Sequence, residues 1–278
     1  MRDPLEEAVN LRRRGERGAL CTVTRISGST PAREAMRMVV RGDGTALGTV
    51  GGGHFEETVR KAALLTMADE ECRSLTFELT EDDDMEPGLV CGGTLEVFVE
   101  PLTVPGLVVL GAGHLGRAIA RIAAPAGFRV AVADDRPGHA NRERFPAAAE
   151  IHALPWEEAF EVLGVDDLAS VVIVTRSCNL DERCLAWALS TPARYIGMVG
   201  SARKVARARE RLAATGLASV AFERVHAPVG LDLGARTHEE IAVSVVAELI
   251  AVRRTGASPR PPGSARHGTR KSPKGQKA

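Results

Sequence analysis

The spacing of apolar residues changes along the chain, and each spacing predicts a different element. Apolar side chains about one turn apart predict a helix over residues 4–18. Leu95, Val97 and Val99 instead alternate with other side chains, which is typical of a strand. The same two patterns predict the rest of the first half, with strands over 19–24, 36–40, 46–50 and 94–100 and a helix over 55–67.

In the second half, short apolar runs alternate with helical patterns. The runs are rich in β-branched residues, as in the segment SVVIVT at 170–175, and they predict buried strands. Regular alternation of strands and helices is typical of a parallel sheet covered by helices. The predicted strands span 107–110, 129–133, 170–175 and 195–199, and the predicted helices include 115–122, 156–163 and 237–252, with others ending at Leu189 and beginning near Ser201.

A glycine-rich turn joins the first of these strands to its helix. Gly111, Gly113 and Gly116 are spaced as G-x-G-x-x-G, and the second strand ends at Asp134. In dinucleotide-binding units the first glycine permits a tight turn, the second lets the backbone approach a pyrophosphate, and the third lets the helix pack closely. The segment therefore predicts a Rossmann-type unit in which Asp134 accepts hydrogen bonds from a ribose hydroxyl. A turn that is kept for packing alone is the alternative.

The loops after the parallel strands carry the candidate chemistry of the second half. Because the carboxyl ends of parallel strands meet at one edge of a sheet, we expect these loops to line one crevice. Arg203 and Lys204 begin a basic helix at this edge and would reach phosphates, whereas its other arginines fit a solvated face. The other predicted crevice residues are Gly111, Gly113, His114, Gly116, Asp134, Arg176, Cys178, Gly200 and Ser201.

The first half contains a second glycine-rich turn. Gly51, Gly52 and Gly53 stand between a predicted strand and a predicted helix and are followed by His54. N–H groups at a helix N-terminus bind anions, so this turn is a candidate anion site, and a loop that only needs positive φ angles is the alternative. The segment 27–31, rich in hydroxyl and N–H groups, is a further candidate.

Cys91 stands beside Gly92 and Gly93, where the strand 94–100 begins. Because its neighbours have little side-chain bulk, a ligand would reach its thiol; a small buried apolar residue is the equal alternative. The five cysteines of the chain are odd in number and contain no C-x-x-C spacing. This argues against a zinc ribbon or a disulfide framework and favours a reducing, cytoplasmic setting.

Charge and hydropathy exclude some classes of function. The 36 basic and 36 acidic residues balance, so the whole protein is not an electrostatic binder of nucleic acid. Eight of the basic and none of the acidic residues lie in 253–278, so the first 252 residues carry a net charge of −8. No apolar run approaches the ~20 residues of a membrane span, and the N-terminus lacks the apolar segment of a secretory signal. We therefore expect no specific nucleic acid and no membrane as partners.

The pattern divides the chain into three parts. Residues 101–105 predict a linker between an α/β domain over 1–104 and a parallel-sheet domain over 105–254. Residues 255–278 consist mainly of Pro, Gly, Ser, Lys and Arg. Such a composition cannot bury enough apolar surface to offset the entropy of ordering, so it predicts a disordered basic tail.

Several sequence blocks, in the right order over about residues 10–252, resemble the XdhC/CoxI family of xanthine dehydrogenase accessory factors. The blocks are SGSTP at 27–31, GTVGGG at 48–53 with Glu56, Cys91-Gly92-Gly93, GAGHLG, ADDRP, YIGMVGSARK and APVGLDLGARTHEEIAVSVVAEL. The resemblance implies an N-terminal α/β XdhC/CoxI-type domain followed by a Rossmann-like XdhC C-terminal domain.

The resemblance also implies a role in handling a cofactor and no turnover reaction. Proteins of this family bind the molybdenum cofactor, protect it, assist its sulfuration and deliver it to a molybdenum hydroxylase such as xanthine dehydrogenase. A cysteine desulfurase and a second copy of the chain are further partners that it implies. Glycine-rich helix N-termini suit the phosphate of molybdopterin, and thiolates are soft ligands able to approach molybdenum.

One departure from the family changes the candidate thiol. Many members carry a cysteine in the N-terminal glycine motif, as S-G-G-C, where this chain has His54. Cys91 is therefore the first candidate for contacting molybdenum, and Cys178 is the second. The candidate cofactor-binding residues of the first half are Ser27, Ser29, Thr30, Gly51, Gly52, Gly53, His54, Glu56, Cys91 and Gly92.

Two other functions stay open beside a cofactor-handling accessory protein. The GAGHLG segment and Asp134 would suit an NAD(P)-dependent oxidoreductase, but the first half shows no obvious Lys–Tyr or His–Asp pair for hydride transfer. A scaffold regulated by a nucleotide is the other alternative. The sequence leaves open whether NAD(P), another nucleotide or the molybdenum cofactor fills the crevice.

Overall fold

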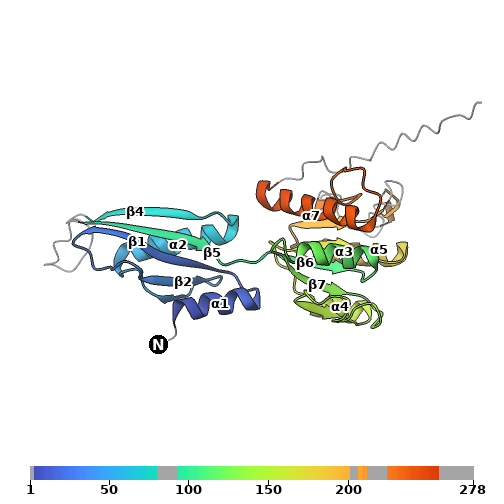
Figure 1. The fold of residues 1–278 in the computed structure, drawn as a ribbon, viewed down its shortest axis with the longest axis horizontal. Coiled ribbons are helices and arrows are strands. Elements are labelled where there is room, and N and C mark those ends of the chain that lie inside the picture. Colours follow the sequence, from blue (N-terminus) through green and yellow to red (C-terminus); the bar gives the residue numbers. More distant parts are fainter. Residues whose placement is uncertain (1–2, 80–92, 201–205, 209, 212–223, 257–278) are drawn as a thin grey trace, which may run out of the picture. The chain divides into compact units, whose positions relative to one another are not determined.

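The computed structural model describes residues 3–79, 93–200, 206–208, 210–211 and 224–256 (Figure 1). The chain divides into two compact units, Met1–Val104 (unit one) and Pro105–Ala278 (unit two), each with a sheet of its own. Several predicted features lie outside the described residues. They are Cys91, Gly92, Ser201, Arg203, Lys204 and the tail from 257 to 278.

Unit one is built on a five-stranded antiparallel sheet in the order β3-β2-β1-β5-β4. Its strands are β1 (Gly18–Gly28), β2 (Arg37–Arg41), β3 (Ala46–Gly48), β4 (Arg73–Leu79) and β5 (Gly93–Pro101). The alternation predicted for β5 is confirmed, since Leu95, Val97 and Val99 are buried. The sequence analysis missed β4, although Leu75 and Phe77 alternate with polar residues and pack against the core.

Two helices cover opposite faces of this sheet (Figure 1). Helix α1 (Pro4–Arg14) packs Leu11 onto one face. It ends earlier than the predicted residue 18, because Gly15 adopts a left-handed conformation that caps it. Helix α2 (Gly53–Asp69) places an apolar stripe against the other face. That stripe consists of Phe55, Val59, Ala63 and Met67.

Unit two contains a six-stranded parallel sheet, which confirms the predicted α/β class with a Rossmann-like domain. The strand order is β11-β10-β9-β6-β7-β8. The strands are β6 (Gly106–Leu110), β7 (Arg129–Ala133), β8 (Glu150–His152), β9 (Ser170–Ile173), β10 (Tyr195–Met198) and β11 (Val225–His226). The sequence analysis missed β8 and β11, which are too short to show a period.

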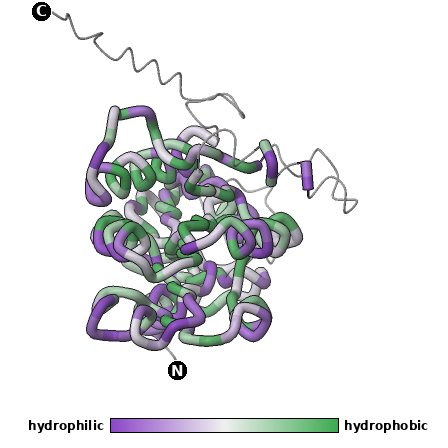
Figure 2. Tube along the Cα trace, turned by 90° about the vertical axis from the view of Figure 1, so that its right-hand side faces the viewer, coloured by the Kyte–Doolittle hydropathy of each residue, from purple (hydrophilic) through white to green (hydrophobic). Residues whose placement is uncertain are grey.

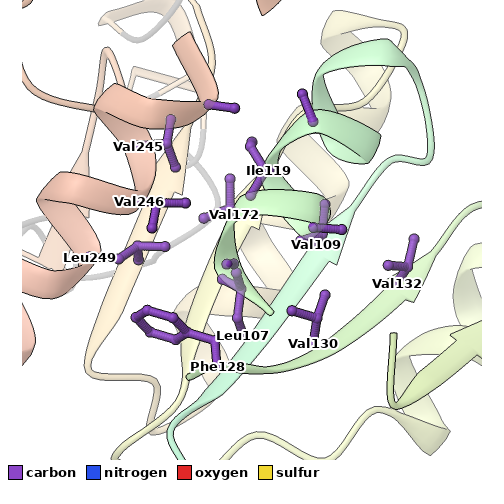
Figure 3. Close-up of a cluster of buried hydrophobic side chains, with 14 of the residues drawn as sticks. Leu107, Val109, Ile119, Phe128, Val130, Val132, Val172, Val245, Val246 and Leu249 are labelled. Carbon is purple, nitrogen blue, oxygen red and sulfur yellow. The ribbon is translucent and has the colours of Figure 1, made fainter. Parts of the chain in front are cut away.

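Helices cover both faces of the parallel sheet. Helices α3 (His114–Ala123) and α7 (His238–Thr255) pack on one face, where Figure 3 shows Ile119, Val245 and Leu249 against strand valines. Helices α4 (Trp156–Val162) and α5 (Cys178–Ser190) pack on the other face. The strands are therefore buried on both sides, which explains their nearly continuous apolar runs.

Two helix starts test the local signals in the sequence. Thr237, where the predicted helix 237–252 begins, forms a complete capping box with Glu240 at α7. Helix α5, for which the sequence predicted an end at Leu189, begins at Cys178, because the Ser177 side chain accepts a hydrogen bond from the N–H of Leu180. Cys178 therefore lies in the first helical turn and not in a loop.

The helices bury many of their apolar side chains and leave others exposed, such as Leu65 of α2 and Val243 of α7. Figure 2 shows hydrophobic and hydrophilic segments following one another along the helical parts of the chain. Among the described residues, no helix combines the length and the apolar character that crossing a bilayer requires.

Candidate functional site

The strand order of unit two defines where a ligand would bind. From β6 the chain runs outward to β7 and β8 on one side and then returns to β9 on the other side. The carboxyl ends of β6 and β9 therefore flank a topological switch point, which is where open parallel sheets bind ligands. The G-x-G-x-x-G segment at 111–116, hereafter the Rossmann turn, begins at this point.

Glycine occupies the three positions of the Rossmann turn for different structural reasons. A methyl group on Gly111, whose φ is 117°, would lie 2.5 Å from the carbonyl oxygen of Val174. A methyl group on Gly116 would lie 2.0 Å from the carbonyl oxygen of Gly111. At Gly113, however, a methyl group would meet nothing within 4 Å. Packing thus requires the first and third glycines, and the second leaves an open backbone surface of the kind that receives a pyrophosphate.

Helix α3 starts at this open surface. Its N-cap is Gly113, and no side chain of the described residues caps its first turn. The unpaired N–H groups and the positive end of the helix dipole therefore remain available to an anion. His114, the first helical residue, is exposed and stacks on His238 with ring centroids 5.6 Å apart. The sequence analysis found His114 and missed His238, which carries no motif of its own.

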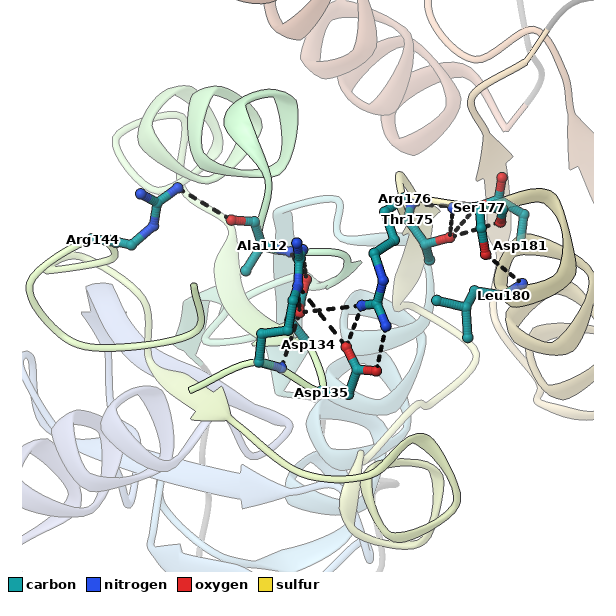
Figure 4. Close-up of polar contacts among 10 residues, drawn as sticks. Ala112, Asp134, Asp135, Arg144, Thr175, Arg176, Ser177, Leu180 and Asp181 are labelled. Carbon is teal, nitrogen blue, oxygen red and sulfur yellow. Dashed lines mark hydrogen bonds and ion pairs between the residues drawn. The ribbon is translucent and has the colours of Figure 1, made fainter. Parts of the chain in front are cut away.

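The carboxylate of Asp134 accepts a hydrogen bond from the backbone of the Rossmann turn. It is 2% exposed, and its Oδ2 accepts hydrogen bonds from the N–H of Ala112 at 2.8 Å and from Arg136 Nη2 at 2.8 Å (Figure 4). Its Oδ1 accepts from Arg136 Nε at 2.8 Å and from the Arg136 N–H at 3.1 Å. The predicted contact of Asp134 with a ribose does not fit this arrangement, because both carboxylate oxygens are buried and occupied.

Asp135, the next residue, is paired from across the switch point. Arg176, which follows β9, donates to both of its carboxylate oxygens, with 2.8 Å between Nη2 and Oδ2 (Figure 4). Arg176 Nη1 also lies 4.0 Å from Asp134 Oδ1. The predicted crevice residues Arg176 and Asp134 are therefore brought together, and the sequence analysis missed the roles of Asp135 and Arg136 between them.

The electrostatics of this cluster favour the charged forms. Burial by itself would raise the pKa of Asp134, but hydrogen bonds from Arg136 and from Ala112 outweigh it, so that pKa lies below its ordinary value. Hydrogen bonds from Arg176 likewise lower the pKa of Asp135. The carboxylates in turn raise the pKa values of Arg136 and Arg176, which contact them.

A third arginine reaches the Rossmann turn from the segment after β7. Arg144 Nη2 lies 3.3 Å from the carbonyl oxygen of Ala112 (Figure 4). Its Nε is buried and has no hydrogen-bond partner among the described residues. Three guanidinium groups, those of Arg136, Arg144 and Arg176, therefore lie at this edge together with the carboxylates of Asp134, Asp135 and Asp181. No motif in the sequence pointed to Arg144.

The remaining described crevice residues lie at the same edge of the sheet. Thr175 Oγ1 lies 2.6 Å from Asp181 Oδ1, which fixes the loop between β9 and α5. Cys178, at the start of α5, is exposed, whereas Cys184 in the same helix is buried and its pKa is raised by burial. Gly200 follows β10. Cys178 is therefore the accessible thiol of this edge among the described residues.

Unit two also contains a buried polar cluster that the sequence analysis missed. Glu248 is 1% exposed, and its Oε2 accepts hydrogen bonds from Tyr195 Oη and from the Gly230 N–H, each at 2.7 Å. His226 Nδ1 lies 3.4 Å from its Oε1. Burial opposes ionisation, but the hydrogen bonds from His226, Tyr195 and Gly230 lower the pKa of Glu248 to about 2. An acidic residue within the apolar stripe of α7 was the available signal.

The glycines 51–53 of unit one, hereafter the triple-glycine turn, have φ values of 130°, 80° and 74°. Glu56 organises the turn: its Oε2 accepts from Thr49 Oγ1 at 2.6 Å and from the Gly52 N–H at 3.0 Å. A methyl group on Gly52 would meet nothing within 4 Å, so this backbone surface is open. His54 lies in the first turn of α2.

The structure joins three of the candidate segments of unit one. Gly28 pairs with Gly93 in the β1–β5 ladder, so the segment 27–31 lies beside the start of β5. A methyl group on Gly93 would lie 2.6 Å from the carbonyl oxygen of Ser27, and one on Gly51 would lie 2.9 Å from Ala32 Cβ. Ser27, Ser29 and Thr30 therefore adjoin the start of β5, and Ala32, which follows this segment, adjoins the triple-glycine turn.

Thiols and carboxylates of unit one do not form a metal site within the described residues. Cys21 is fully buried, and burial together with the charge of Glu56 raises its pKa to about 12, which makes it a poor nucleophile. Across the described parts of both units, no group of three or more His, Cys, Asp or Glu residues is placed to hold a metal ion.

Comparisons with known proteins identify the family. Residues 107–249 match the XdhC Rossmann domain, and residues 11–78 match the XdhC and CoxI family. The uncharacterized protein YqeB of Escherichia coli (strain K12) is 36% identical over 249 residues, which cover 89% of this chain and 46% of YqeB. A probable xanthine dehydrogenase subunit of Bacillus subtilis (strain 168) is 32% identical over 164 residues, 58% of this chain and 47% of that protein.

The chain spans about half the length of the curated relatives it matches. A solved structure of a xanthine dehydrogenase from Bacillus halodurans is 22% identical with a TM-score of 0.49, covering 93% of this chain and 98% of that chain. The match to the XdhC Rossmann domain by itself covers more than half of the sequence. The predicted resemblance is confirmed, and the chain belongs to the XdhC and CoxI family, with an XdhC Rossmann domain in its second unit.

Proposed function

We propose that this chain is an accessory protein of a xanthine dehydrogenase-type molybdenum hydroxylase. It binds the molybdenum cofactor, protects it, assists its sulfuration and inserts it into the enzyme. Membership of the XdhC and CoxI family supports this proposal. The matched protein of Bacillus subtilis carries the name of a xanthine dehydrogenase subunit, which agrees with a client of that kind.

The observation that carries the proposal is the open backbone of the triple-glycine turn. Gly52, the N-cap of α2, leaves space where a side chain would lie, and its N–H is held by the carboxylate of Glu56. Such a surface fits the phosphate of molybdopterin, since N–H groups and the helix dipole favour an anion. When bound, the cofactor would supply the redox chemistry of its molybdenum centre, and this chain would bind it, shield it and assist its sulfuration.

Three groups of residues have roles in this proposal. Glu56 and Thr49 hold the triple-glycine turn in its open conformation. Ser27, Ser29 and Thr30 offer hydroxyl groups beside the start of β5. Cys91, which precedes the strand paired with this segment, is the thiol that we assign to the molybdenum centre, with Cys178 as the second candidate. A cysteine desulfurase as sulfur donor and a homodimer are part of the same proposal.

The test is retention of the cofactor. We expect protein purified from a host that makes the cofactor to carry molybdenum through gel filtration, measured by elemental mass spectrometry of the protein peak. Cys91→Ser should reduce the molybdenum content, and Cys72→Ser, which alters an exposed thiol outside the candidate segments, should leave it unchanged. A protein peak without molybdenum, together with reduction of a substrate by NAD(P)H, would favour the oxidoreductase instead.

A further inference from the structure

We infer that the crevice at the Rossmann turn selects a dinucleotide whose adenosine ribose carries a 2′-phosphate, and that Arg136 and Arg176 are the selecting residues. The nucleotide concerned is of the NADP type, as opposed to the NAD type. This nucleotide site goes beyond the proposed function, because it involves neither the triple-glycine turn nor the molybdenum cofactor.

The first step concerns the acid at the end of β7. In NAD-binding units, a carboxylate at this place accepts hydrogen bonds from the two ribose hydroxyls. Asp134 occupies the place but is 2% exposed, and it already accepts four hydrogen bonds, from Arg136 and from the Ala112 N–H. A ribose diol would have to displace a buried charge-assisted hydrogen bond and so gains nothing from this residue.

The second step concerns the groups that face the crevice instead. The side chains of Arg136 and Arg176 are 34% and 43% exposed. Arg136 contacts Asp134, and Arg176 contacts Asp135, as Figure 4 shows for Arg176. Arg136 Nη1 and Arg176 Nε have no hydrogen-bond partner among the described residues. These donors remain for a ligand, and an arginine near this position is what accommodates a 2′-phosphate.

The third step concerns the balance of charge. The two carboxylates are matched by Arg136 and Arg176, so Asp135 no longer presents an unpaired negative charge to a phosphate. Arg144 adds a third guanidinium beside the Rossmann turn, and the N-terminus of α3 adds its positive dipole end. A phosphate monoester, with nearly two negative charges, is therefore favoured at this edge over a neutral ribose.

Isothermal titration calorimetry with matched nucleotides tests the inference. We expect NADP⁺ to bind at least about ten-fold more tightly than NAD⁺, and 2′,5′-ADP to exceed 5′-AMP similarly, because each pair differs by one phosphate and charge-assisted hydrogen bonds are worth this much. The preference should shrink as salt is raised. Equal affinities, a preference for NAD⁺, or no binding of either nucleotide would overturn the inference.

A variant assigns the preference to the arginines. Arg176→Gln should remove most of the ten-fold preference for NADP⁺, because it removes a donor to the 2′-phosphate and leaves Asp135 without the arginine that it contacts. Arg121→Gln is the matched control, since Arg121 is an exposed arginine in the last turn of α3, away from the crevice. Thermal unfolding verifies that each variant is folded. The molybdenum content of the same preparations is measured separately, so a failed nucleotide site and a failed cofactor site give different results.

Discussion

Each of the two glycine-rich turns is held by one carboxylate, and the two carboxylates differ in position and exposure. In each, a carboxylate holds a backbone N–H of the turn: Glu56 accepts from Gly52 at 3.0 Å, and Asp134 accepts from Ala112 at 2.8 Å. Glu56 comes from the helix that the turn begins, is partly exposed, and also binds Thr49. Asp134 comes from the neighbouring strand, is buried, and is bound by Arg136.

The two turns therefore differ in whether their geometry depends on local sequence or on the packing of distant elements. The triple-glycine turn is shaped by residues within eight positions of each other, so it depends mainly on local sequence. The Rossmann turn depends on Asp134, which lies 22 residues from Ala112. It therefore adopts this conformation only when β6 and β7 are paired. Loss of the acid should consequently disturb unit two more than unit one.

The largest expected effect is that of Asp134→Ala. The change leaves the Ala112 N–H and the Arg136 guanidinium without their buried partner, which costs about 3–5 kcal/mol in the free energy of unfolding. Glu56→Ala in unit one should cost only about 1 kcal/mol, since its carboxylate is partly exposed and water replaces it. Denaturant unfolding followed by tryptophan fluorescence measures unit two, because both tryptophans, Trp156 and Trp187, lie there.

Asp135→Ala is the control for this comparison, because its side chain is 24% exposed and its ion pair with Arg176 is worth at most about 1 kcal/mol. Equal losses for Asp134→Ala and Asp135→Ala would show that the buried acid is no more important than its exposed neighbour. The proposed contrast between the two turns would then be wrong.

Acid should lower the free energy of unfolding of unit two by slightly less than Asp134→Ala does. The folded-state pKa of Glu248, about 2, lies below the ordinary value of 4.5, so its carboxylate stabilises the fold above pH 4.5. That stability, about 3 kcal/mol, is lost as the pH falls from about 4.5 to 2. The lowered pKa of Asp134 acts in the same direction. Tryptophan fluorescence at a series of pH values measures the slope.

Glu248→Gln isolates this contribution, since the variant has no charge to lose and its stability should vary less over the same range. His226 faces Glu248 within the cluster, so the parallel variant His226→Asn shows whether the histidine contributes to the slope. An unchanged slope in Glu248→Gln would show that the buried cluster does not carry the acid sensitivity of unit two.

Glycine substitutions in the Rossmann turn should separate packing from binding. Gly116→Ala should cost about 2–3 kcal/mol, because its methyl group would lie 2.0 Å from the carbonyl oxygen of Gly111. Gly113→Ala should change stability by less than about 0.5 kcal/mol and still abolish nucleotide binding, because its methyl group fills the open surface. The measurements are denaturant unfolding and calorimetric titration. Retained binding in Gly113→Ala would show that no ligand approaches this backbone.

Sequence reasoning located most elements and the edge of the parallel sheet at which the candidate residues lie. The period of apolar residues was enough for the central strands, because these are buried on both faces and read as continuous apolar runs. The motif spacing located Gly111, Gly113 and Gly116, and the close contacts at Gly111 and Gly116 agree with the tight turn and the close helix packing predicted for them. The two shortest strands, β8 and β11, escaped because three and two residues show no period.

The partners of Asp134 could not be derived in the same way. An acid after the second strand of such a unit is a ribose ligand when exposed and a structural group when buried, and the motif is identical in both cases. The choice depends on Arg136 folding back onto the acid and on Arg176 arriving from β9. Glu248 escaped for a related reason, since only the assembled fold brings Tyr195 and Gly230 to it.

The smallest expected effect concerns the thiols beside the two turns. Cys21, on the strand near Glu56, is buried with a pKa raised to about 12, whereas Cys178 is exposed at the start of α5. In a Cys91→Ser background at pH 8, a thiol reagent should therefore label Cys72 and Cys178 quickly and leave Cys21 and Cys184 unreacted until the protein unfolds. Peptide mass spectrometry identifies the labelled sites.

Cys178→Ser should change the free energy of unfolding by less than about 0.5 kcal/mol, because an exposed side chain in a first helical turn makes few contacts. Rapid labelling of Cys21 would mean that the triple-glycine turn opens in solution, and the local hydrogen bonds of Glu56 would then be too weak to hold it.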